Sequence, residues 1–392
     1  MNDMVPVRTR QQAGLSLIEL MIAMVIGLVL ILGVIQIFSA SRTAAQLAEG
    51  ASRAQENARF AIDYLQRDIR MAGHFGCVND QAHFVRGDGD PVVNFAGVAS
   101  GSGHPLDFSV SIQGYEAPNT APGGSLTIGG AWSVPTGLPT AISALSPRGG
   151  SDILVLRYFS PLGVPVESVT VSGANSVLGV PVARWQSLTN GMTGSPVLFG
   201  VADCQHADVF QGSASAAGVN ATAANLGRYT PQPNGQTMVY RAESVVYYVA
   251  NGASGEPALW RARADASGSY PAALREELVE GIESLQLLFG LDNTATIASG
   301  TPPVGNITVQ NVASAVTTAT NATGANQWRR VGLVQVGILA RSPSRAAANN
   351  PANVNARQRA LGVAFVPPAS GDGRYRSTYE FTVALRNRLF GN

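Results

Sequence analysis

The sequence contains no lysine. All 26 of its cationic side chains are arginines, and 25 Asp and Glu leave the 392-residue chain with a net charge of +1. A P-loop NTPase and a Schiff-base enzyme both need an amine at a fixed position, so both classes are excluded. Because only 13% of the residues are charged, no basic surface for nucleic acid or acidic lipid is indicated. We expect no nucleic-acid partner.

Motifs of the common enzyme classes are also missing. The chain has no GxSxG nucleophile elbow, no HExxH helix and no GxGxxG turn. Its four histidines stand at positions 74, 83, 104 and 206, in segments rich in turn residues. No nucleophile is singled out together with a base. We therefore predict that the protein is not an enzyme, has no catalytic residue and holds no cofactor or metal.

Long apolar runs are absent outside the N-terminus. There, residues 14–38 read GLSLIELMIAMVIGLVLILGVIQIF, and no polar side chain occurs from Leu20 to Ile35. As a helix, Leu15 to Phe38 would be about 36 Å long, which is enough to cross a bilayer. This segment is predicted to span a membrane.

One carboxylate, that of Glu19, lies at the start of the apolar run. A charged side chain inside an apolar helix costs about 2.5 to 3.5 kcal/mol, so it needs a partner or a place at the membrane interface. A chain that began at Leu15 would have a free amine one helical turn from Glu19. We expect Glu19 of one subunit to neutralise the N-terminal amine of a neighbour; a position in the headgroup layer is the alternative.

The order of the N-terminal parts resembles the type III signal of prepilins. Arg8, Arg10 and Gly14 precede the apolar run, whereas an ordinary secretory signal has its cleavage site after that run. The resemblance implies that prepilin peptidase cuts between Gly14 and Leu15, that Leu15 is N-methylated and that the helix is retained. The family most often has Phe where this chain has Leu15. A conventional signal peptide cut after residues 39–41 is the alternative.

The helical pattern continues beyond the apolar run. Apolar residues recur at steps of three or four, with charged residues between them. This stripe consists of Leu47, Ala51, Ala54, Ala58, Ile62, Leu65, Ile69 and Ala72. Gly73 is well placed to end the helix. We predict one nearly continuous helix over 15–72, which Gly27, Gly33 and Gly50 loosen. For Gly27 and Gly33, close helix packing in the membrane is the alternative.

Only two cysteines occur, Cys77 and Cys204. A leader followed by a spanning helix would deliver both to an oxidising compartment, so a single disulfide is the natural inference. His74 and His206 lie close to them in the sequence, which makes a zinc site an alternative, although the paired spacing of structural zinc sites is lacking. Two free thiols are the third alternative.

The rest of the chain alternates short apolar groups with turn residues. Its 43 glycines and 22 prolines favour short strands over a helical bundle. Strands are predicted at 153–158, 164–171, 196–201, 238–249, 258–261, 328–341 and 375–389, with a hairpin turn at 251–252. We expect a helical turn and then a strand in 274–291, and loop insertions at 211–227 and 294–326. A long helix followed by a large antiparallel β-rich head is an α+β fold.

Six segments resemble PilW-type minor pilins, which are type IV pilus assembly proteins. They are RDIRMAGHFGC (67–77), IQGYE (112–116), GSDILVLRY (150–158), the pair 203–204 with 208–210, LVEGIESLQLLFGLD (278–292) and TVALRNR (382–388). These matches extend through the whole chain except the low-complexity insertions. They make the resemblance more specific than the N-terminal signal does.

This resemblance implies an organisation and a role. Residues 1–14 are a cleaved leader, 15–38 span the inner membrane, 39–73 form the amphipathic periplasmic half of the helix and 74–392 form the periplasmic head. The protein would prime type IV pilus assembly and take part in it near the pilus tip, with effects on cell adhesion and twitching motility. The implied partners are prepilin peptidase, other minor pilins, the major pilin, the inner membrane and a tip adhesin.

Two other functions are compatible with the sequence. A J-type minor pseudopilin of a type II secretion system shares the signal and a similar head. A membrane-anchored periplasmic binding module or enzyme would use the helix only as an anchor, so Glu19 would be dispensable in such a protein.

Overall fold

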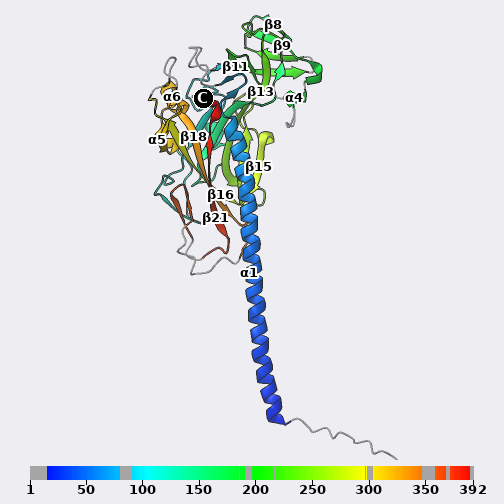
Figure 1. Cartoon of the computed structure of the whole chain (residues 1–392), viewed down its shortest axis with the longest axis vertical. Coiled ribbons are helices and arrows are strands. Elements are labelled where there is room, and N and C mark those ends of the chain that lie inside the picture. The colour runs from blue at the N-terminus through cyan, green and yellow to red at the C-terminus, as the bar shows by residue number, and fades with distance from the viewer. Residues whose placement is uncertain are drawn as a thin grey trace, which may run out of the picture.

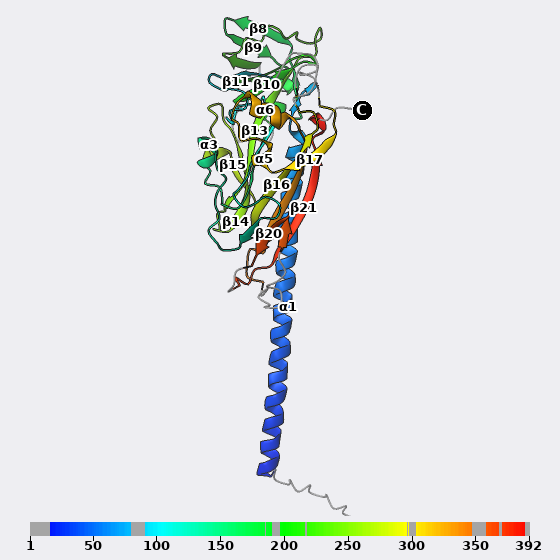
Figure 2. The same cartoon turned by 90° about the vertical axis from the view of Figure 1, so that its left-hand side faces the viewer.

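The computed structural model describes residues 16–79, 91–184, 186–189, 197–215, 218–295, 297, 303–346, 358–367 and 371–388. In this part of the chain, one long helix projects from a β-rich head (Figures 1 and 2). The head packs against one side of the upper part of the helix, and the lower part stands free. The α+β prediction is confirmed.

Helix α1 extends from Leu17 to Met71, and its 55 residues make it about 82 Å long. Ser16 caps its start, where the Ser16 hydroxyl accepts a hydrogen bond from the backbone N–H of Glu19 at 3.2 Å. Ala72 caps its end, and Gly73 then adopts a φ of 74°, a conformation that glycine permits at no steric cost. The predicted single helix ending at Gly73 is therefore observed.

A sheet of twelve strands forms most of the head. Eight of them follow the order β15-β14-β13-β10-β11-β12-β9-β8, and β3, β4, β6 and β7 pair beside this path. The strands are β3 (Val92–Asn94), β4 (Ile112–Tyr115), β6 (Ile153–Phe159), β7 (Val164–Pro165), β8 (Ser168–Ser172), β9 (Asn175–Gly179), β10 (Leu198–Ala202), β11 (Ala207–Ser215), β12 (Gly218–Thr222), β13 (Met238–Asn251), β14 (Pro257–Arg263) and β15 (Arg275–Glu280).

A four-stranded antiparallel sheet in the order β17-β16-β18-β21 packs beside α1. Its strands are β16 (Ile282–Asp292), β17 (Ile307–Asn311), β18 (Val331–Arg341) and β21 (Arg376–Ala384). The smaller sheets contain β1 (His74–Phe75), β2 (Val78–Asn79), β5 (Ser125–Thr127), β19 (Gln358–Ala360) and β20 (Val363–Val366). Short helices are α3 (Thr140–Ser143), α4 (Gln186–Thr189), α5 (Ala313–Val316), α6 (Ala322–Arg329), η1 (Val182–Arg184), η2 (Ala272–Leu274) and η4 (Arg386–Arg388).

Strand β13 lies between two hydrophobic cores. Val245, Tyr247 and Val249 point into the core that α1, β6, β16, β18 and β21 share. Val246 and Tyr248 point into a second core on the opposite face. When both faces of a strand are buried, apolar and polar residues do not alternate along it. This explains the continuous apolar run around residue 247. The expected hairpin is present, because β13 pairs with β14 out to Asn251 opposite Pro257.

Four local predictions are wrong. The loop predicted over 211–227 is contradicted at 211–215 and 218–222, where β11 pairs with β12. The segment 294–326 contains β17, α5 and the start of α6. The helical turn expected early in 274–291 is strand β15, and residue 328 belongs to α6 rather than to the strand that follows. In the first two segments, pairing and burial by distant segments override a local composition rich in small residues.

Candidate functional site

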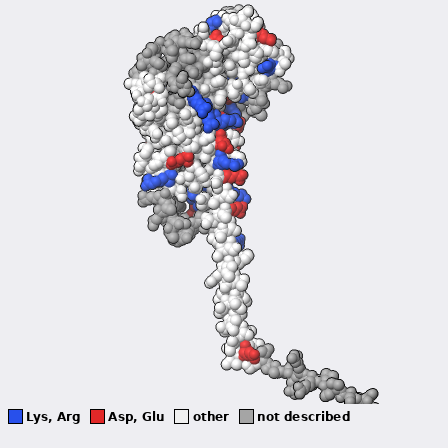
Figure 3. All heavy atoms as spheres, viewed as in Figure 1, with Lys and Arg blue, Asp and Glu red and all other residues white. Residues whose placement is uncertain are grey.

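The lower half of α1 is apolar and uncovered. Between Leu17 and Phe38, every large apolar side chain is 49% to 78% exposed. The most apolar window of the helix has a mean hydropathy of 2.9, and none of it is buried. Figure 3 shows this half free of charge except where the helix begins. By length and composition the segment can cross a membrane.

Glu19 lies in the first turn of this helix. A carboxylate there interacts favourably with the positive end of the helix dipole. Its side chain is exposed, and no residue in the described part of the chain forms an ion pair with it. Gly14 and Leu15 lie outside the described residues, so the cleavage position stays a prediction.

The upper half of α1 packs against the head through a narrow stripe. The buried residues of the helix are Gly50, Ala54, Ala58, Ala61, Leu65, Asp68 and Ile69. Small side chains predominate, so the sheet can approach the helix backbone closely. Leu47, which we predicted in this stripe, is 39% exposed because it precedes the first buried residue of the helix.

Gly50 marks the point where α1 enters the head. A Cβ atom added at Gly50 would clash with the Cβ of Ala346, whereas Gly27 and Gly33 have nothing within 4 Å. Gly50 is therefore a site of close approach, and its role as a point of loosening is not supported. Gly27 and Gly33 lie in the uncovered half, where both sequence-based interpretations stay open.

A buried carboxylate joins α1 to the large sheet. Asp68 is 2% exposed and accepts hydrogen bonds from the Tyr247 hydroxyl at 2.6 Å and from Nη1 of Arg261 at 3.1 Å. Arg261 also donates to Glu276 at 2.7 Å. Burial, and then the neighbouring Asp68, raise the pKa of the Tyr247 hydroxyl well above its ordinary value, so it stays protonated and donates. This network fixes the rotation of α1 on the head.

Sequence reasoning did not identify Asp68. The available signal was an acidic residue at a position that helical periodicity places inside an apolar stripe, between Leu65 and Ile69. Such a position predicts a buried polar contact. The partners Tyr247 and Arg261 lie more than 170 residues away in the chain, and no local pattern points to them.

The two cysteines are bonded to each other. Cys77 follows α1, Cys204 follows β10, and a disulfide joins them across 127 positions of the chain. With both sulfurs bonded, the alternatives of a zinc site and of two free thiols do not apply. His74 lies edge-on to Tyr240, with ring centres 6.4 Å apart. The bond holds the segment after the helix against the large sheet.

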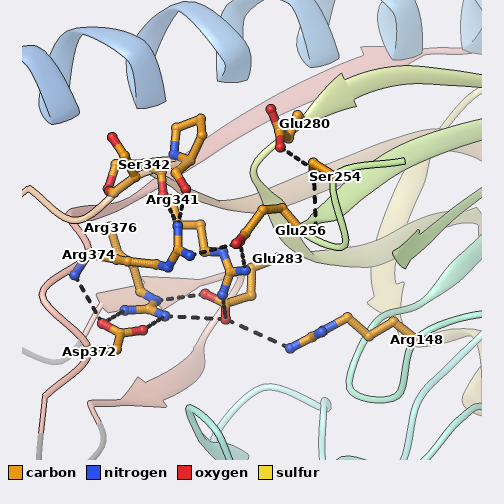
Figure 4. Close-up of polar contacts among 12 residues, drawn as sticks. Arg148, Ser254, Glu256, Glu280, Glu283, Arg341, Ser342, Asp372, Arg374 and Arg376 are labelled. Atoms are coloured by element: carbon orange, nitrogen blue, oxygen red, sulfur yellow. Dashed lines mark hydrogen bonds and ion pairs between the residues drawn. The ribbon is translucent and has the colours of Figure 1, made fainter. Parts of the chain in front are cut away.

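An ionic network closes the end of the head where α1 emerges (Figure 4). Its centre is Glu283, 1% exposed, which contacts Nε of Arg376 at 2.6 Å and Nη1 of Arg341 at 3.2 Å. Asp372 binds the same Arg376 at 2.6 Å. Burial by itself raises the pKa of the Asp372 carboxyl, but Arg376 and a backbone N–H outweigh burial and lower the pKa to about 2.

This network joins β16, β18 and β21 to the turn after β13. Glu256, in that turn, binds Arg374 at 2.6 Å and also Arg341. Each carboxylate of the network contacts at least two arginines, so the network holds the strands together, although the buried Nε of Arg341 has no hydrogen-bond partner in the described structure. The network was not predicted, since its members are spread over the sequence.

Arg157 is a fully buried cation, with 0% exposure. Its guanidinium donates to the carbonyl oxygens of His104, Pro105 and Val110 at 2.7 to 2.9 Å. These contacts hold the loop before β4 against β6. Like the ionic network around Glu283, the contacts of Arg157 hold separate segments of the head together. In the described residues, no three His, Cys, Asp or Glu side chains lie together in a way that could hold a metal ion.

Comparison with known proteins adds family information. A family model described as type IV pilus-assembly protein W matches residues 246–387. The prokaryotic N-terminal methylation motif matches residues 9–35. No curated protein matches the chain. Among solved structures, a type IV-like pilin from Thermus thermophilus aligns with 15% identity over 50% of this chain and 85% of its own, with a TM-score of 0.20, which is too low to relate the two folds.

The two family matches fall on the two structural parts described above. The methylation motif includes the uncovered start of α1. The other match extends from within β13 to the end of β21, and so includes the four-stranded sheet on which α1 packs. The two matches support a type IV pilus minor pilin of the PilW type.

Proposed function

We propose that the chain is a membrane-anchored subunit that primes and takes part in type IV pilus assembly near the pilus tip. The observation that carries the proposal is the division of α1. Its lower half, up to Phe38, exposes large apolar side chains and carries no charge apart from Glu19, while its upper half is held in the head by Asp68. A helix built this way can stay in a membrane and then exchange lipid for the apolar helices of neighbouring subunits.

In this proposal, prepilin peptidase removes residues 1–14 on the cytoplasmic side and Leu15 becomes the methylated N-terminus. Residues 15–38 span the inner membrane, 39–73 form the outer half of the helix, and the head from residue 74 lies in the periplasm. The disulfide supports this location, since such bonds persist in oxidising compartments. The matched families are structural proteins, and no catalytic step is part of the proposal.

Glu19 is the proposed assembly residue. Its carboxylate has no partner within the described chain and lies at the start of an apolar helix, where an unpaired charge is costly in lipid. The N-terminal amine of a neighbouring subunit would supply the opposite charge and set the axial register. Proposed neighbours are other minor pilins and the major pilin, and the head is free to contact a tip adhesin.

The mature N-terminus tests the processing step. Mass spectrometry of the purified chain should show a start at Leu15 with one added methyl group. A start at Arg42 would mean that the apolar segment had been discarded as an ordinary signal peptide, and the proposal would then be wrong.

Glu19→Ala tests the assembly step. We expect the variant to reach the membrane at normal levels but to be lost from pili sheared off the cell surface, as measured by immunoblot. Gln36→Ala, which truncates an exposed but uncharged polar side chain in the same uncovered half of α1, is the control for general effects of a substitution there. Equal recovery of wild type and Glu19→Ala in sheared pili would contradict the proposal.

Deletion of the gene distinguishes the pilus from a secretion system. The PilW match favours the pilus, so we expect loss of surface pili and of twitching motility. Normal pili together with loss of secreted enzymes would instead identify a J-type pseudopilin.

A further inference from the structure

Strand β8 forms a free edge of the large sheet. It is the last strand on the path β15-β14-β13-β10-β11-β12-β9-β8, and within the described residues it pairs only with β9. Figures 1 and 2 show β8 at the end of the head that is farthest from the uncovered half of α1, with β9 between it and the rest of the head. The edge therefore faces away from the segment that can span a membrane.

This edge lacks the features by which proteins protect an exposed strand. Exposed edges commonly carry charged side chains, proline or a bulge, which prevent another strand from pairing. At the other end of the same path, β15 reads REELVE, in which only Leu278 and Val279 are uncharged. In contrast, β8 reads SVTVS, with no charge and no proline, and its register with β9 is unbroken from Ser168 to Ser172. The β8 edge is therefore open to a further strand.

The backbone groups on the free edge belong to Val169 and Val171. Ser172 and Asn175 enclose a two-residue turn, and Gly173 at its first central position has a φ of 60°, as a type II′ hairpin turn requires. Residues that enclose such a turn form a hydrogen-bonded pair, and hydrogen-bonded pairs alternate with non-hydrogen-bonded pairs along the strands. Every second residue from Ser172 therefore directs its N–H and C=O groups to β9. The groups of Val169 and Val171, which lie between those residues, point outward.

The order of residues in β8 is the same in both directions, because residues 168–172 read Ser, Val, Thr, Val and Ser. The edge is thus complementary to itself. When two copies of β8 pair antiparallel about Thr170, Val169 of one copy lies opposite Val171 of the other, and each such pair can exchange both of its hydrogen bonds. Thr170 lies opposite Thr170, and threonine pairs stabilise antiparallel sheets. A second copy of this chain therefore fits the edge in register.

The same pairing covers an exposed apolar side chain and brings no like charges together. Val169 packs against the core that contains Leu178, whereas Val171, on the same face of the strand, is 40% exposed. In the pair, Val171 of each copy lies beside Val169 of the other. The nearest charged residue in the sequence, Glu167, lies outside the paired segment and opposite Gly173, which has no side chain.

The symmetry of such a pair sets the direction of the helices. Two antiparallel neighbours in one sheet are related by half a turn about an axis perpendicular to the sheet, which reverses every direction within its plane. Figures 1 and 2 show β8, β9 and β11 following one another along the long axis of the molecule. The rotation therefore directs the two α1 helices away from each other, and two copies anchored in one membrane cannot pair in this way.

We propose that the β8 edge binds a second copy of this chain, and that the two copies belong to the pili of different cells. The two heads then share one continuous antiparallel sheet. This inference rests on the proposed function, which places the head near the pilus tip, and it adds a direct contact between two tips. An edge of five residues gives an interface at the small, transient end of the size range, so single pairs form and separate readily.

A cysteine on the two-fold axis tests the pairing. Both native cysteines are bonded, so Thr170→Cys adds one free thiol. In the pair this residue lies opposite itself as a non-hydrogen-bonded pair, with Cα atoms about 4.5 Å apart, which is within the range of a disulfide. After oxidation of the purified full-length chain in detergent with copper phenanthroline, we expect a disulfide-linked dimer.

Ser213→Cys is the matched control. Ser213 is exposed on the same face of the sheet and in the same cross-strand row as Thr170, with Asn220 and Val177 between them. In the pair the two copies of Ser213 would lie about 34 Å apart, so the yield of its dimer should be at least about tenfold lower. Equal yields of the two dimers, or no dimer of Thr170→Cys, would overturn the inference.

Mixed cells test whether the two copies come from different pili. Two piliated strains, each with Thr170→Cys as the only source of the chain but with different epitope tags, are mixed and oxidised. We expect dimers that carry both tags. Dimers that carry only one tag, or no dimer although the chain is present in pili, would overturn the contact between pili. Absence of the wild-type chain from sheared pili, together with dimers of the purified Thr170→Cys chain, would instead contradict the proposed function and leave the pairing intact.

Discussion

Replacing Asp68 should weaken the attachment of the helix to the head more than any other change of a single acid in α1. In Asp68→Asn the side chain keeps its size but loses its charge. The Tyr247 hydroxyl and Nη1 of Arg261, at 2.6 and 3.1 Å from the carboxylate, then lose an anionic acceptor. Both residues are nearly fully buried, so water cannot replace it.

The magnitude follows from the burial of this network. Breaking a buried ion pair by removing one partner costs about 3 to 5 kcal/mol. Arg261 keeps a second acid, Glu276, at 2.7 Å, which places the expected loss near the lower end, about 3 kcal/mol. On a scale of 2 to 4 °C per kcal/mol, the midpoint of thermal unfolding should fall by about 6 to 12 °C.

The assay is denaturant unfolding of the full-length chain in detergent, followed by tryptophan fluorescence. Asp63→Asn is the matched control, since Asp63 is exposed on the same helix, and its effect should stay within about 0.5 kcal/mol. A double-mutant cycle with Tyr247→Phe should give a coupling of about 0.5 to 3 kcal/mol. A loss below about 1 kcal/mol for Asp68→Asn, or equal losses for both variants, would refute the assigned role.

Three further predictions concern stability. Replacing Cys77 and Cys204 together by Ser removes a cross-link over 127 positions and should lower the free energy of unfolding by about 4 to 5 kcal/mol in the chain-entropy treatment; a loss below about 1 kcal/mol in denaturant titration would contradict this. Gly50→Ala should lower the thermal midpoint because the new Cβ clashes with the head, whereas Gly33→Ala, with open space around it, should not; equal midpoints would show that the close approach is unimportant. Burial raises the pKa of the Asp152 carboxyl from 3.8 to about 8, so between these values the folded state holds a proton that the unfolded state has lost. The free energy of unfolding should therefore fall as pH rises from about 4 to 8, and Asp152→Asn should remove that part of the slope; identical slopes in both proteins would be the contrary result.

Local patterns were reliable wherever the physical cause is local. The apolar run, the stripe up to Ile69 and the glycine at residue 73 predicted α1 to within a few residues. The hairpin at 251–252 follows from turn residues between two apolar runs and is also observed. The disulfide was inferred from the compartment that the N-terminal segment implies, and the structure contains it.

Long-range pairing was not predictable in the same way. Residues 211–215 and 218–222 have the small, polar composition of a loop, but they pair as β11 and β12, and β12 in turn pairs with the neighbouring strand β9. The short runs from which these strands are built carry no information about which distant segment completes their hydrogen bonds.

The amino-acid sequence alone determined that this protein has one long N-terminal helix. The first half of that helix is apolar with an acid at its start, and the second half carries an apolar stripe. The sequence also determined that the remainder of the chain is β-rich. Those properties follow from periodicity and hydrophobicity, which act over a few residues. Only the tertiary structure decided what packs against that stripe and which contacts Asp68 and Gly50 make on it. That decision depends on contacts with Tyr247, Arg261 and Ala346, which come together only when distant strands pair.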